Sequence, residues 1–180
     1  MTKIDRLTAA DIRAKVPDLS DVLIDCVENG ASVGFLSPLS PERADAFWLS
    51  VAVAVDAGRR VVFVSRQASS RIDGTVQLVL AGAENQPHRA DIAKLLVHTR
   101  ARRQGMADQL MQAAETHARS IGRDLLVLDT ATDEAARLYE RLGWTRSGII
   151  PDYALNPDGS RTSTIFYWKG FSSQTDEGAG

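Results

Sequence analysis

The sequence lacks the features that mark disulfide-stabilised, secreted and membrane-spanning proteins. It contains one cysteine, Cys26, so no disulfide can form within the chain. This thiol lies in an apolar helical pattern, and we expect a small buried residue rather than a nucleophile, in a reducing, cytoplasmic setting. No apolar run reaches the roughly 18 residues of a membrane span, and the first residues lack the apolar core of a signal peptide. We therefore expect neither membrane association nor an export signal.

An excess of positive charge is also missing. The chain has 21 basic and 23 acidic residues and a net charge of -2, whereas a nucleic-acid-binding domain is commonly strongly basic. Its three histidines do not have the spacing of metal ligands. The sequence therefore predicts no nucleic-acid partner and no metal.

What the sequence does have is enough apolar residues, 44%, for one globular domain with a full core. We expect this domain to span residues 1–171, and we expect the small polar residues 172–180 to form a disordered tail. Composition leaves both a monomer and a homodimer open.

Apolar periodicity and helix-capping residues predict alternating helices and strands. Helices are expected between Thr8 and Gly30 with a break near Pro17, from Pro41 to Gly58, after Gly105, and from Thr132 to Gly143. Strands are expected at 4–7, 59–67, 72–82, 91–98 and 125–130, and on both sides of a turn at 156–159. In the helix after Gly105, Ile121 is expected to face the core and Glu115 to face water.

The strand, helix, strand order around Gly105 implies one parallel pair of strands with a right-handed crossover, while the other pairs are antiparallel. The predicted fold class is therefore α/β (α+β), with a mixed, mostly antiparallel sheet in one domain and helices on both of its faces. Strict alternation along 91–98 would place Asp91, Ala93, Leu95 and Val97 on one face, provided that no bulge intervenes.

The stretch RARRQGMADQLM, Arg100 to Met111, places three arginines and a glycine where a helix begins. The first N–H groups of a helix lack partners within it, and the helix dipole adds positive charge there, so a phosphate suits this position. Gly105 lets the backbone approach a ligand closely. Arg100, Arg102 and Arg103 would add mobile charge around the rim. A solvated arginine-rich turn is an equally good interpretation of these residues alone.

Two motifs then resemble a known family. Arg102–Ala107 resembles the Arg/Gln-x-x-Gly-x-Gly/Ala signature of the GNAT superfamily of N-acetyltransferases, and the stretch 128–144 resembles that family's next strand and helix. The stretches NGASVGF, HRADIAKLLV, LLVLDT and PDGSRTSTIFYWK are similar to the tabtoxin-resistance acetyltransferases of the same superfamily. The resemblance implies a splayed central pair of parallel strands, acetyl-CoA as cosubstrate, and a small amino-acid-like amine as acceptor, such as a β-lactam toxin of the tabtoxinine type.

The resemblance also implies roles for individual residues. Cofactor binding is expected from the backbone of Leu95, Leu96 and Val97, from the turn Arg102, Arg103, Gln104, Gly105, Met106 and Ala107, and from Thr132. Tyr139 matches the family's general acid, which protonates the departing thiolate. Asp91 and Asp129 are the candidate bases, and Asp129 has helix capping or binding of the substrate ammonium as its alternative.

Phe35, Trp48 and Tyr153 are the candidate walls of the acceptor pocket, although core packing is the preferred interpretation of Trp48. Two other functions stay open at this point. One is a domain that binds acetyl-CoA without turnover, as a sensor. The other is acetylation of protein N-termini or lysines, which needs an open groove.

Overall fold

The computed structural model describes residues 2–67 and 71–171, so the expected disordered tail at 172–180 lies outside the described residues. The strands are β1 (Lys3–Leu7), β2 (Arg60–Arg66), β3 (Ile72–Leu80), β4 (Arg89–Val97), β5 (Leu125–Thr130), β6 (Thr145–Leu155) and β7 (Arg161–Gly170). The helices are α1 (Ala9–Ala14), α2 (Val16–Glu28), α3 (Pro41–Asp56), α4 (Met106–Ser120) and α5 (Asp133–Arg141), with a short 3-10 turn, η1 (Thr99–Ala101).

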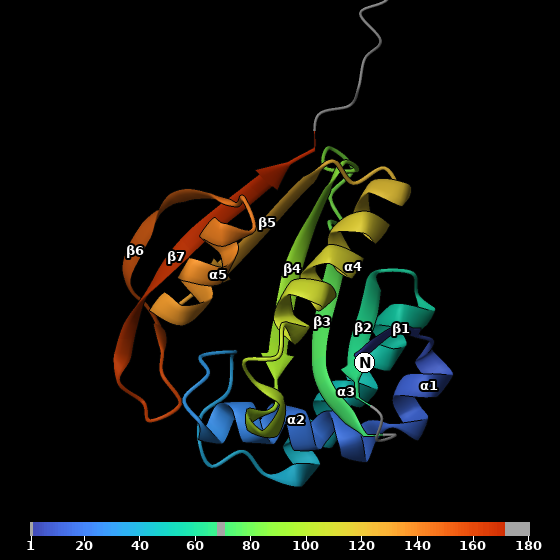
Figure 1. The fold of residues 1–180 in the computed structure, drawn as a ribbon, viewed down its shortest axis with the longest axis vertical. Coiled ribbons are helices and arrows are strands. Elements are labelled where there is room, and N and C mark those ends of the chain that lie inside the picture. The colour runs from blue at the N-terminus through green and yellow to red at the C-terminus, as the bar shows by residue number, and fades with distance from the viewer. Residues whose placement is uncertain (1, 68–70, 172–180) are drawn as a thin grey trace, which may run out of the picture.

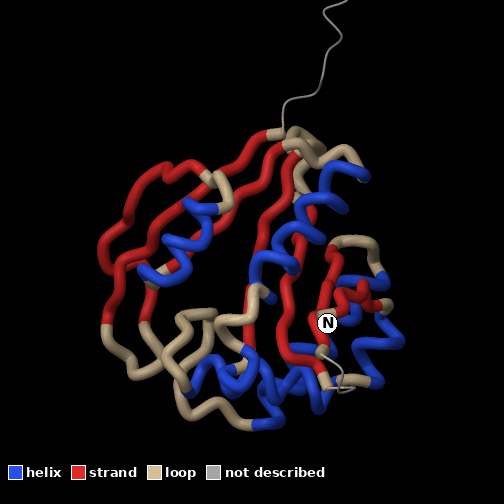
Figure 2. Tube along the Cα trace, in the orientation of Figure 1, coloured by secondary structure: helices blue, strands red, loops and turns tan. Residues whose placement is uncertain are grey.

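The strands form a seven-stranded sheet in the order β1-β2-β3-β4-β5-β7-β6. β4 and β5 are parallel and the other neighbours are antiparallel. Helices α4 and α5 cover one face, and α1, α2 and α3 pack against the other (Figures 1 and 2). The predicted fold class, with one parallel pair in a mixed sheet and helices on both faces, is confirmed.

Local sequence signals account for the N-terminal elements. The Thr8 side chain accepts a hydrogen bond from the Asp11 amide, and the Asp11 carboxylate accepts one from the Thr8 amide, so both halves of the capping box are present. The helical segment breaks at Lys15, two residues before Pro17, as expected of a proline that needs a first-turn position.

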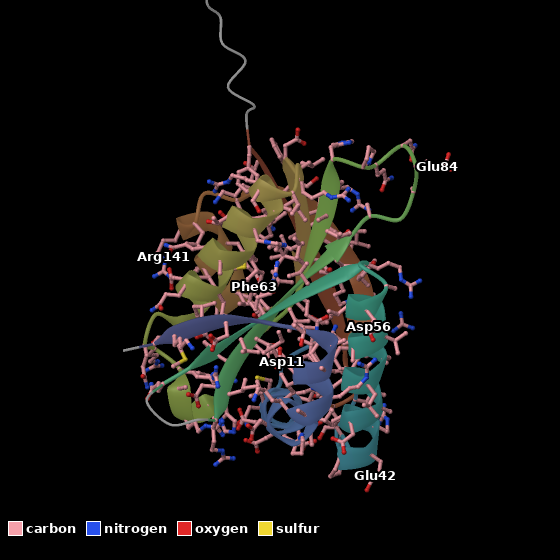
Figure 3. All side chains as sticks on the ribbon, turned by 90° about the vertical axis from the view of Figure 1, so that its right-hand side faces the viewer. Asp11, Glu42, Asp56, Phe63, Glu84 and Arg141 are labelled. Atoms are coloured by element: carbon pink, nitrogen blue, oxygen red, sulfur yellow. The ribbon has the colours of Figure 1, made fainter. Side chains whose placement is uncertain are left out.

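The core has one part on each face of the sheet. In β2, Val62 and Val64 pack with the buried residues of α1 to α3, while Phe63 between them packs with those of α4 and α5. Figure 3 shows Phe63 inside the molecule, whereas Glu42 and Glu84 point away from it. The period-2 alternation of a strand therefore buries apolar side chains on both faces.

β4 and β5 stay together for only part of their length. Their ladder joins Arg89, Ala90 and Asp91 to Leu125, Leu126 and Val127, and then it ends. Figure 1 shows the two strands meeting at the top of the view and moving apart below. Beyond Asp91, the β5-facing side of β4 has no strand partner, and its backbone groups must be satisfied by something else.

A bulge in β4 overturns the expected alternation along this strand. Thr75 of β3 pairs with Leu96 and Gln77 pairs with Ala93, so two residues of β4, Lys94 and Leu95, oppose one residue of β3. Lys94 has a φ of 51°, in the left-handed region that few non-glycine residues adopt. Ile92 consequently packs on the α4 side and Leu96 on the α2 and α3 side. Asp91 and Leu95 do not share a face.

Two expectations for α4 are wrong. Ile121 is 40% exposed because the helix ends at Ser120, so the helical period no longer applies at this residue. Glu115 is only 5% exposed instead of facing water. Its carboxylate accepts hydrogen bonds from Trp144 Nε1 at 2.9 Å and from Lys169 Nζ at 2.7 Å. Glu115 thereby ties α4 to β7 and to the segment after α5, on either side of the point where the sheet divides.

Removing this carboxylate should destabilise the fold strongly. Glu115→Ala leaves the Trp144 N–H without its acceptor and the Lys169 ammonium without its carboxylate, with the Leu142 carbonyl at 2.7 Å as its remaining acceptor. We expect a loss of about 3–5 kcal/mol in the free energy of unfolding, measured by urea denaturation. Gln112→Ala, an exposed change on the same helix, should stay within about 0.5 kcal/mol of wild type. Equal stabilities of the two variants would contradict this role of Glu115.

Candidate active site

A cavity of about 620 Å³ opens where β4 and β5 separate. Its walls come from the C-terminal end of α2, the end of β4, the turn before α4, and one face of α5. Leu95, Leu96 and Val97 line it along β4. All three therefore lie where the sequence analysis expected a cofactor to run. We refer to this space as the first cavity.

The turn before α4 presents backbone N–H groups to the first cavity. Gly105 is the N-cap residue with a φ of 73°, and it makes no side-chain capping hydrogen bond. Arg103 has a φ of 60°, so the chain is folded into a tight curve. Among the residues that the structure describes, nothing accepts a hydrogen bond from the amides of residues 103–108. These amides and the positive end of the helix dipole form an anion site without a protein occupant.

The arginines of this turn differ in what they do. The sequence analysis expected Arg100 to add mobile charge at the rim of the site, and this expectation is wrong. Its guanidinium donates to Asp73 at 2.9 Å, to Asp21 at 2.8 Å and to the Ile72 carbonyl at 2.7 Å. Burial opposes, but these two carboxylates outweigh it and raise the pKa of Arg100. Arg100 is therefore a structural clamp that holds η1 and the turn against β3.

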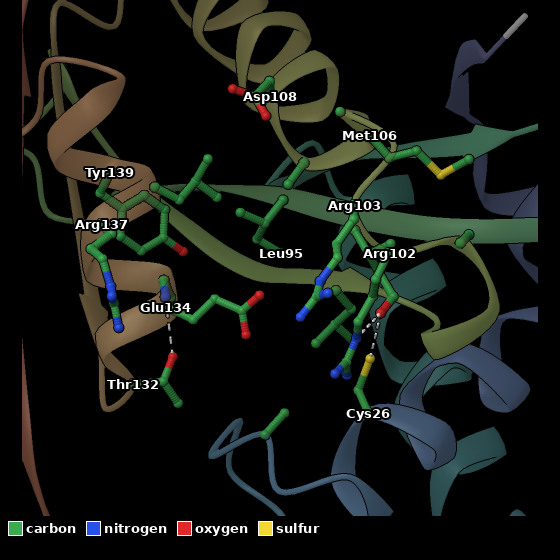
Figure 4. Close-up of a pocket in the computed structure, with 18 of the residues that line it drawn as sticks. Cys26, Leu95, Arg102, Arg103, Met106, Asp108, Thr132, Glu134, Arg137 and Tyr139 are labelled. Carbon is green, nitrogen blue, oxygen red and sulfur yellow. Dashed lines mark hydrogen bonds between the residues drawn. The ribbon is translucent and has the colours of Figure 1, made fainter.

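The other residues of the turn remain at the cavity. Arg102 donates through Nε to the Val97 carbonyl at 3.3 Å, and Figure 4 shows the Arg103 side chain reaching into the space. Met106 and Ala107 line the cavity as well. Gln104 does not, because its side chain turns away and accepts a hydrogen bond from Gln67.

One face of α5 supplies lining residues that the sequence analysis missed. Glu134, Arg137, Leu138 and Arg141 all face the first cavity. Their spacing of three and four residues would have identified a common helix face once one of them was known to line a site. Arg141 also forms an ion pair with Asp108 of α4 at 2.8 Å, which joins α5 to α4 beside the cavity.

Cys26 lines the first cavity but is 2% exposed, as expected of a buried residue. Its thiol donates to the Val97 carbonyl at 3.5 Å. Burial, and then the neighbouring Asp25 carboxylate, raise the pKa of Cys26 to about 11. The group is therefore a thiol at neutral pH, and a nucleophilic role does not suit it.

A second cavity of about 550 Å³ lies beside the first. The link 31–36, the bulged part of β4, the end of β5 and the C-terminal end of β6 enclose it. Phe35 and Tyr153, two of the three expected wall residues, line it. Leu95, Thr132 and Tyr139 line both cavities, so the two spaces meet at these side chains.

Tyr139 stands at this junction and is 6% exposed. Figure 4 shows its hydroxyl directed toward Leu95. Within the described part of the chain the Tyr139 hydroxyl makes no hydrogen bond, which is unusual for a buried tyrosine. Burial, and to a lesser degree the Asp129 charge, raise the pKa of Tyr139 far above its ordinary value. The phenol therefore keeps its proton at neutral pH. Thr132 beside it is the N-cap of α5 and accepts from the Ala135 amide at 3.3 Å.

The two candidate bases are in different places. Asp129 lines the second cavity. Although it is open to solvent there, the cavity walls displace much of its water, and this raises the pKa of Asp129, partly offset by Lys94. Asp91 lines neither cavity, and both of its oxygens accept from Arg89 Nη1 at 3.0 Å. It lies in the paired section of β4, before the strands part.

Trp48 was a candidate wall residue, and the structure contradicts this. Its side chain is 0% exposed and belongs to the core formed with α1 and α2. The neighbouring Phe47 is closer to the second cavity, because its ring meets that of Phe35 at 5.4 Å. Trp48 packs edge-to-face on the Phe47 ring with centroids 5.1 Å apart, but it stays inside the core, which confirms the preferred interpretation of core packing.

Two further classes of site were sought in residues 2–67 and 71–171. No group of three or more His, Cys, Asp or Glu side chains has the geometry to hold a metal ion there. In the same residues, none of the helices combines the length and apolar character that crossing a membrane requires.

A family model described as the acetyltransferase (GNAT) domain matches residues 50–146, more than half of the chain. The chain belongs to the GNAT acetyltransferase family. The match includes both sides of the first cavity: the end of β4 with the turn before α4, and α5 with Tyr139. The family assignment based on the two sequence motifs is therefore confirmed, whereas the match does not reach the tabtoxin-resistance subgroup.

Solved structures with the same fold extend over nearly the whole chain. An N-acetyltransferase from Staphylococcus aureus Mu50 has a TM-score of 0.78 at 15% identity, covering 94% of this acetyltransferase and 98% of that chain. The ribosomal-protein-alanine N-acetyltransferase from Brucella melitensis has a TM-score of 0.76 at 19% identity, covering 94% and 99%. The protein yncA from Salmonella typhimurium, solved with its cofactor acetyl-CoA, has a TM-score of 0.77 at 17% identity, covering 100% and 99%.

The contrast between Arg100 and Arg103 can be tested by stability alone. Arg100→Ala leaves the buried Asp73 carboxylate without its guanidinium partner, and we expect the free energy of unfolding to fall by about 2–3 kcal/mol. Arg103→Ala removes an exposed side chain without a protein partner in the described structure, so its stability should stay within about 0.5 kcal/mol of wild type. Chemical denaturation of both variants measures this, and an unaffected Arg100→Ala protein would show that the clamp is unimportant.

Proposed function

We propose that this protein is an acetyl-CoA-dependent N-acetyltransferase that acetylates the primary amine of a small molecule by direct transfer. One observation carries the proposal. A cavity with unoccupied helix N-terminal amides and a cavity with a carboxylate of raised pKa meet at Tyr139, a largely buried tyrosine that lines both. Each cavity suits one of two substrates, and the shared wall suits a transfer between them.

The residues of the first cavity fit acetyl-CoA. The amides at 103–108 and the side chains of Arg102 and Arg103 would hold its diphosphate. The edge of β4 from Leu95 to Val97, without a partner on its β5 side, would hydrogen-bond the extended pantetheine arm. The Val97 N–H is our candidate donor to the developing oxyanion. When bound, acetyl-CoA supplies the acetyl group as a thioester, whose C–S bond breaks as the amine forms the new C–N bond.

Asp129 and Tyr139 would handle the two protons. An alkyl amine has a pKa of about 10, so it reaches the cavity as an ammonium and must lose a proton before it can attack. Asp129 would bind that ammonium and take the proton at its carboxylate, directly or through water. Tyr139 would keep its proton at Oη and donate it to the departing CoA thiolate. Asp91 has no part in this scheme, because Arg89 holds it outside both cavities.

The second cavity favours a small acceptor over a protein. Ser32 Oγ donates to the Leu155 carbonyl at 3.1 Å, and the Ser37 amide donates to the Pro157 carbonyl at 2.9 Å. These bonds tie the link after α2 to the β6–β7 hairpin and close one side of the cavity. The resemblance of residues 29–35 and 157–169 to tabtoxin-resistance enzymes concerns these same walls, and it supports an amino-acid-like acceptor of that kind.

Release of CoA from acetyl-CoA in the presence of a panel of amines tests the proposal. We expect turnover with small amines, with kcat/KM falling as the pH drops through the raised pKa of Asp129, because only the ionised base accepts a proton. Asp129→Asn should lower the rate at neutral pH roughly 10²-fold. Tight acetyl-CoA binding without turnover would instead favour a sensor domain, and turnover with peptides alone would favour a protein acetyltransferase.

Removing the Tyr139 hydroxyl should affect turnover but not folding. Tyr139→Phe leaves no protein group without a partner in the described structure, so stability should change by less than about 0.5 kcal/mol. We expect kcat to fall roughly 10²-fold, most at low to neutral pH, where the thiolate most needs a proton. Tyr167→Phe is the control for turnover, since its ring lies 5.9 Å from that of Tyr139 and lines neither cavity. This control also loses the hydrogen bond that Tyr167 donates to Glu140 at 2.9 Å, so it is compared by rate and not by stability. An unchanged rate for Tyr139→Phe at every pH removes the hydroxyl from the mechanism.

A further inference from the structure

The second cavity contains one cation and one anion. Among its lining residues, the only side chains that carry a formal charge at neutral pH are Lys94 and Asp129. The remaining walls are apolar or hydroxyl-bearing and include Val33, Phe35 and Tyr153. The proposed reaction uses Asp129 for the acceptor's amine, but it gives Lys94 no function.

The backbone places Lys94 in this cavity at a conformational cost. Lys94 occupies the β4 bulge with a φ of 51°, a region that favours glycine and asparagine. The bulge turns its side chain to the α3 side of the sheet, where the ammonium lies 5.8 Å from the centre of the Phe47 ring. The Lys94 Nζ atom also lies 4.0 Å from the position that a Cβ atom on Gly34 would occupy. Lys94 therefore sits between the Phe47 ring and the link at 31–36.

The Lys94 ammonium is short of partners in this position. It is half-buried, and among the described residues it makes no hydrogen bond and no ion pair within 4.0 Å, Asp129 included. Burial, and then the Arg60 charge, lower the pKa of Lys94, while Asp129 opposes this. An ammonium that has lost water without gaining an anion is costly, and a bound anion would restore the balance.

We propose that Lys94 binds a carboxylate of the acceptor, so that this acetyltransferase selects amines that also carry an acid group and an uncharged side chain. The inference rests on the proposed function and adds the substrate class. Asp129 would take the ammonium end and Lys94 the carboxylate end, while Phe35, Leu36 and Tyr153 would contact the uncharged remainder. A polyamine fits poorly, since its second ammonium would find Lys94 where it needs an anion.

A matched substrate series tests the charge requirement directly. Each amino acid with an uncharged side chain is compared with its primary amide and with its decarboxylated amine, which keep the reacting amine and lose the negative charge. For the wild-type protein we expect kcat/KM to be at least about tenfold higher for the acid than for either neutral analogue, as the loss of one charge-assisted hydrogen bond implies. Equal values for the three compounds would overturn the inference.

Variants of Lys94 assign the preference to this side chain. Lys94→Met, similar in length but neutral, should abolish the preference for the acid, and Lys94→Arg should keep most of it. Lys94→Asn repeats the test with a residue that tolerates positive φ, in case methionine disturbs the bulge. Lys3→Met, a loss of the same charge at an exposed site distant from both cavities, should behave as wild type. An acid preference that persists in both neutral Lys94 variants would also overturn the inference.

The two proposals fail in different ways. Turnover that ignores the carboxylate overturns the role of Lys94 and leaves the acetyltransferase function standing. If no amine in the series is acetylated and acetyl-CoA produces no thermal stabilisation of the protein, the proposed function and the inference fall together. A carboxylate-dependent thermal shift with the acids, lost in Lys94→Met, would support the inference through binding alone.

Discussion

The separation of β4 from β5 is the constraint on which the rest of this structure depends. The two parallel strands share hydrogen bonds only at Arg89–Asp91 and then diverge. A continuous sheet would pair the backbone of β4 and fill the space between α4 and α5. Divergence instead leaves one edge of β4 open in the middle of the sheet, with a cavity on each side of the junction at Leu95 and Tyr139. The hydrogen bonds that buried Glu115 accepts from Trp144 and Lys169 join α4 to β7 and to the segment after α5.

Electrostatics divides the charged residues near the opening into two groups. Asp21 and Asp73 neutralise the charge of Arg100, and these ion pairs fix the turn that precedes α4. That turn can then expose the amides at 103–108 without a protein partner. On the other side, Lys94 and Asp129 face one cavity without forming an ion pair. Residues whose charges are satisfied build the scaffold, whereas residues whose charges are unsatisfied lie where a ligand would bind.

Much of the fold could be predicted from the sequence, because its signals are local. The Thr8 capping box, the helix start at Ser40 and Pro41, and the strand Leu125–Thr130 follow from neighbouring residues alone. The GNAT motifs placed Arg102–Ala107 and Tyr139 on the correct elements. The wrong predictions concern side chains whose environment is set by residues far away in the sequence. Glu115 is buried because Trp144 and Lys169 come to it, and Arg100 is a clamp because Asp21 and Asp73 lie nearby.

The sequence by itself determined the order of the elements, the family and the turn that exposes its amides, since each is written in residues close together along the chain. Only the tertiary structure decided which carboxylate lines a cavity, since Asp129 lines the second cavity and Asp91 lines neither. A single extra residue in β4, at Lys94, reverses the side-chain alternation beyond it, and the β4–β5 ladder ends at the pair Asp91–Val127, before Asp129. Neither event leaves a mark in the local pattern, because both depend on how strands far apart in sequence are paired.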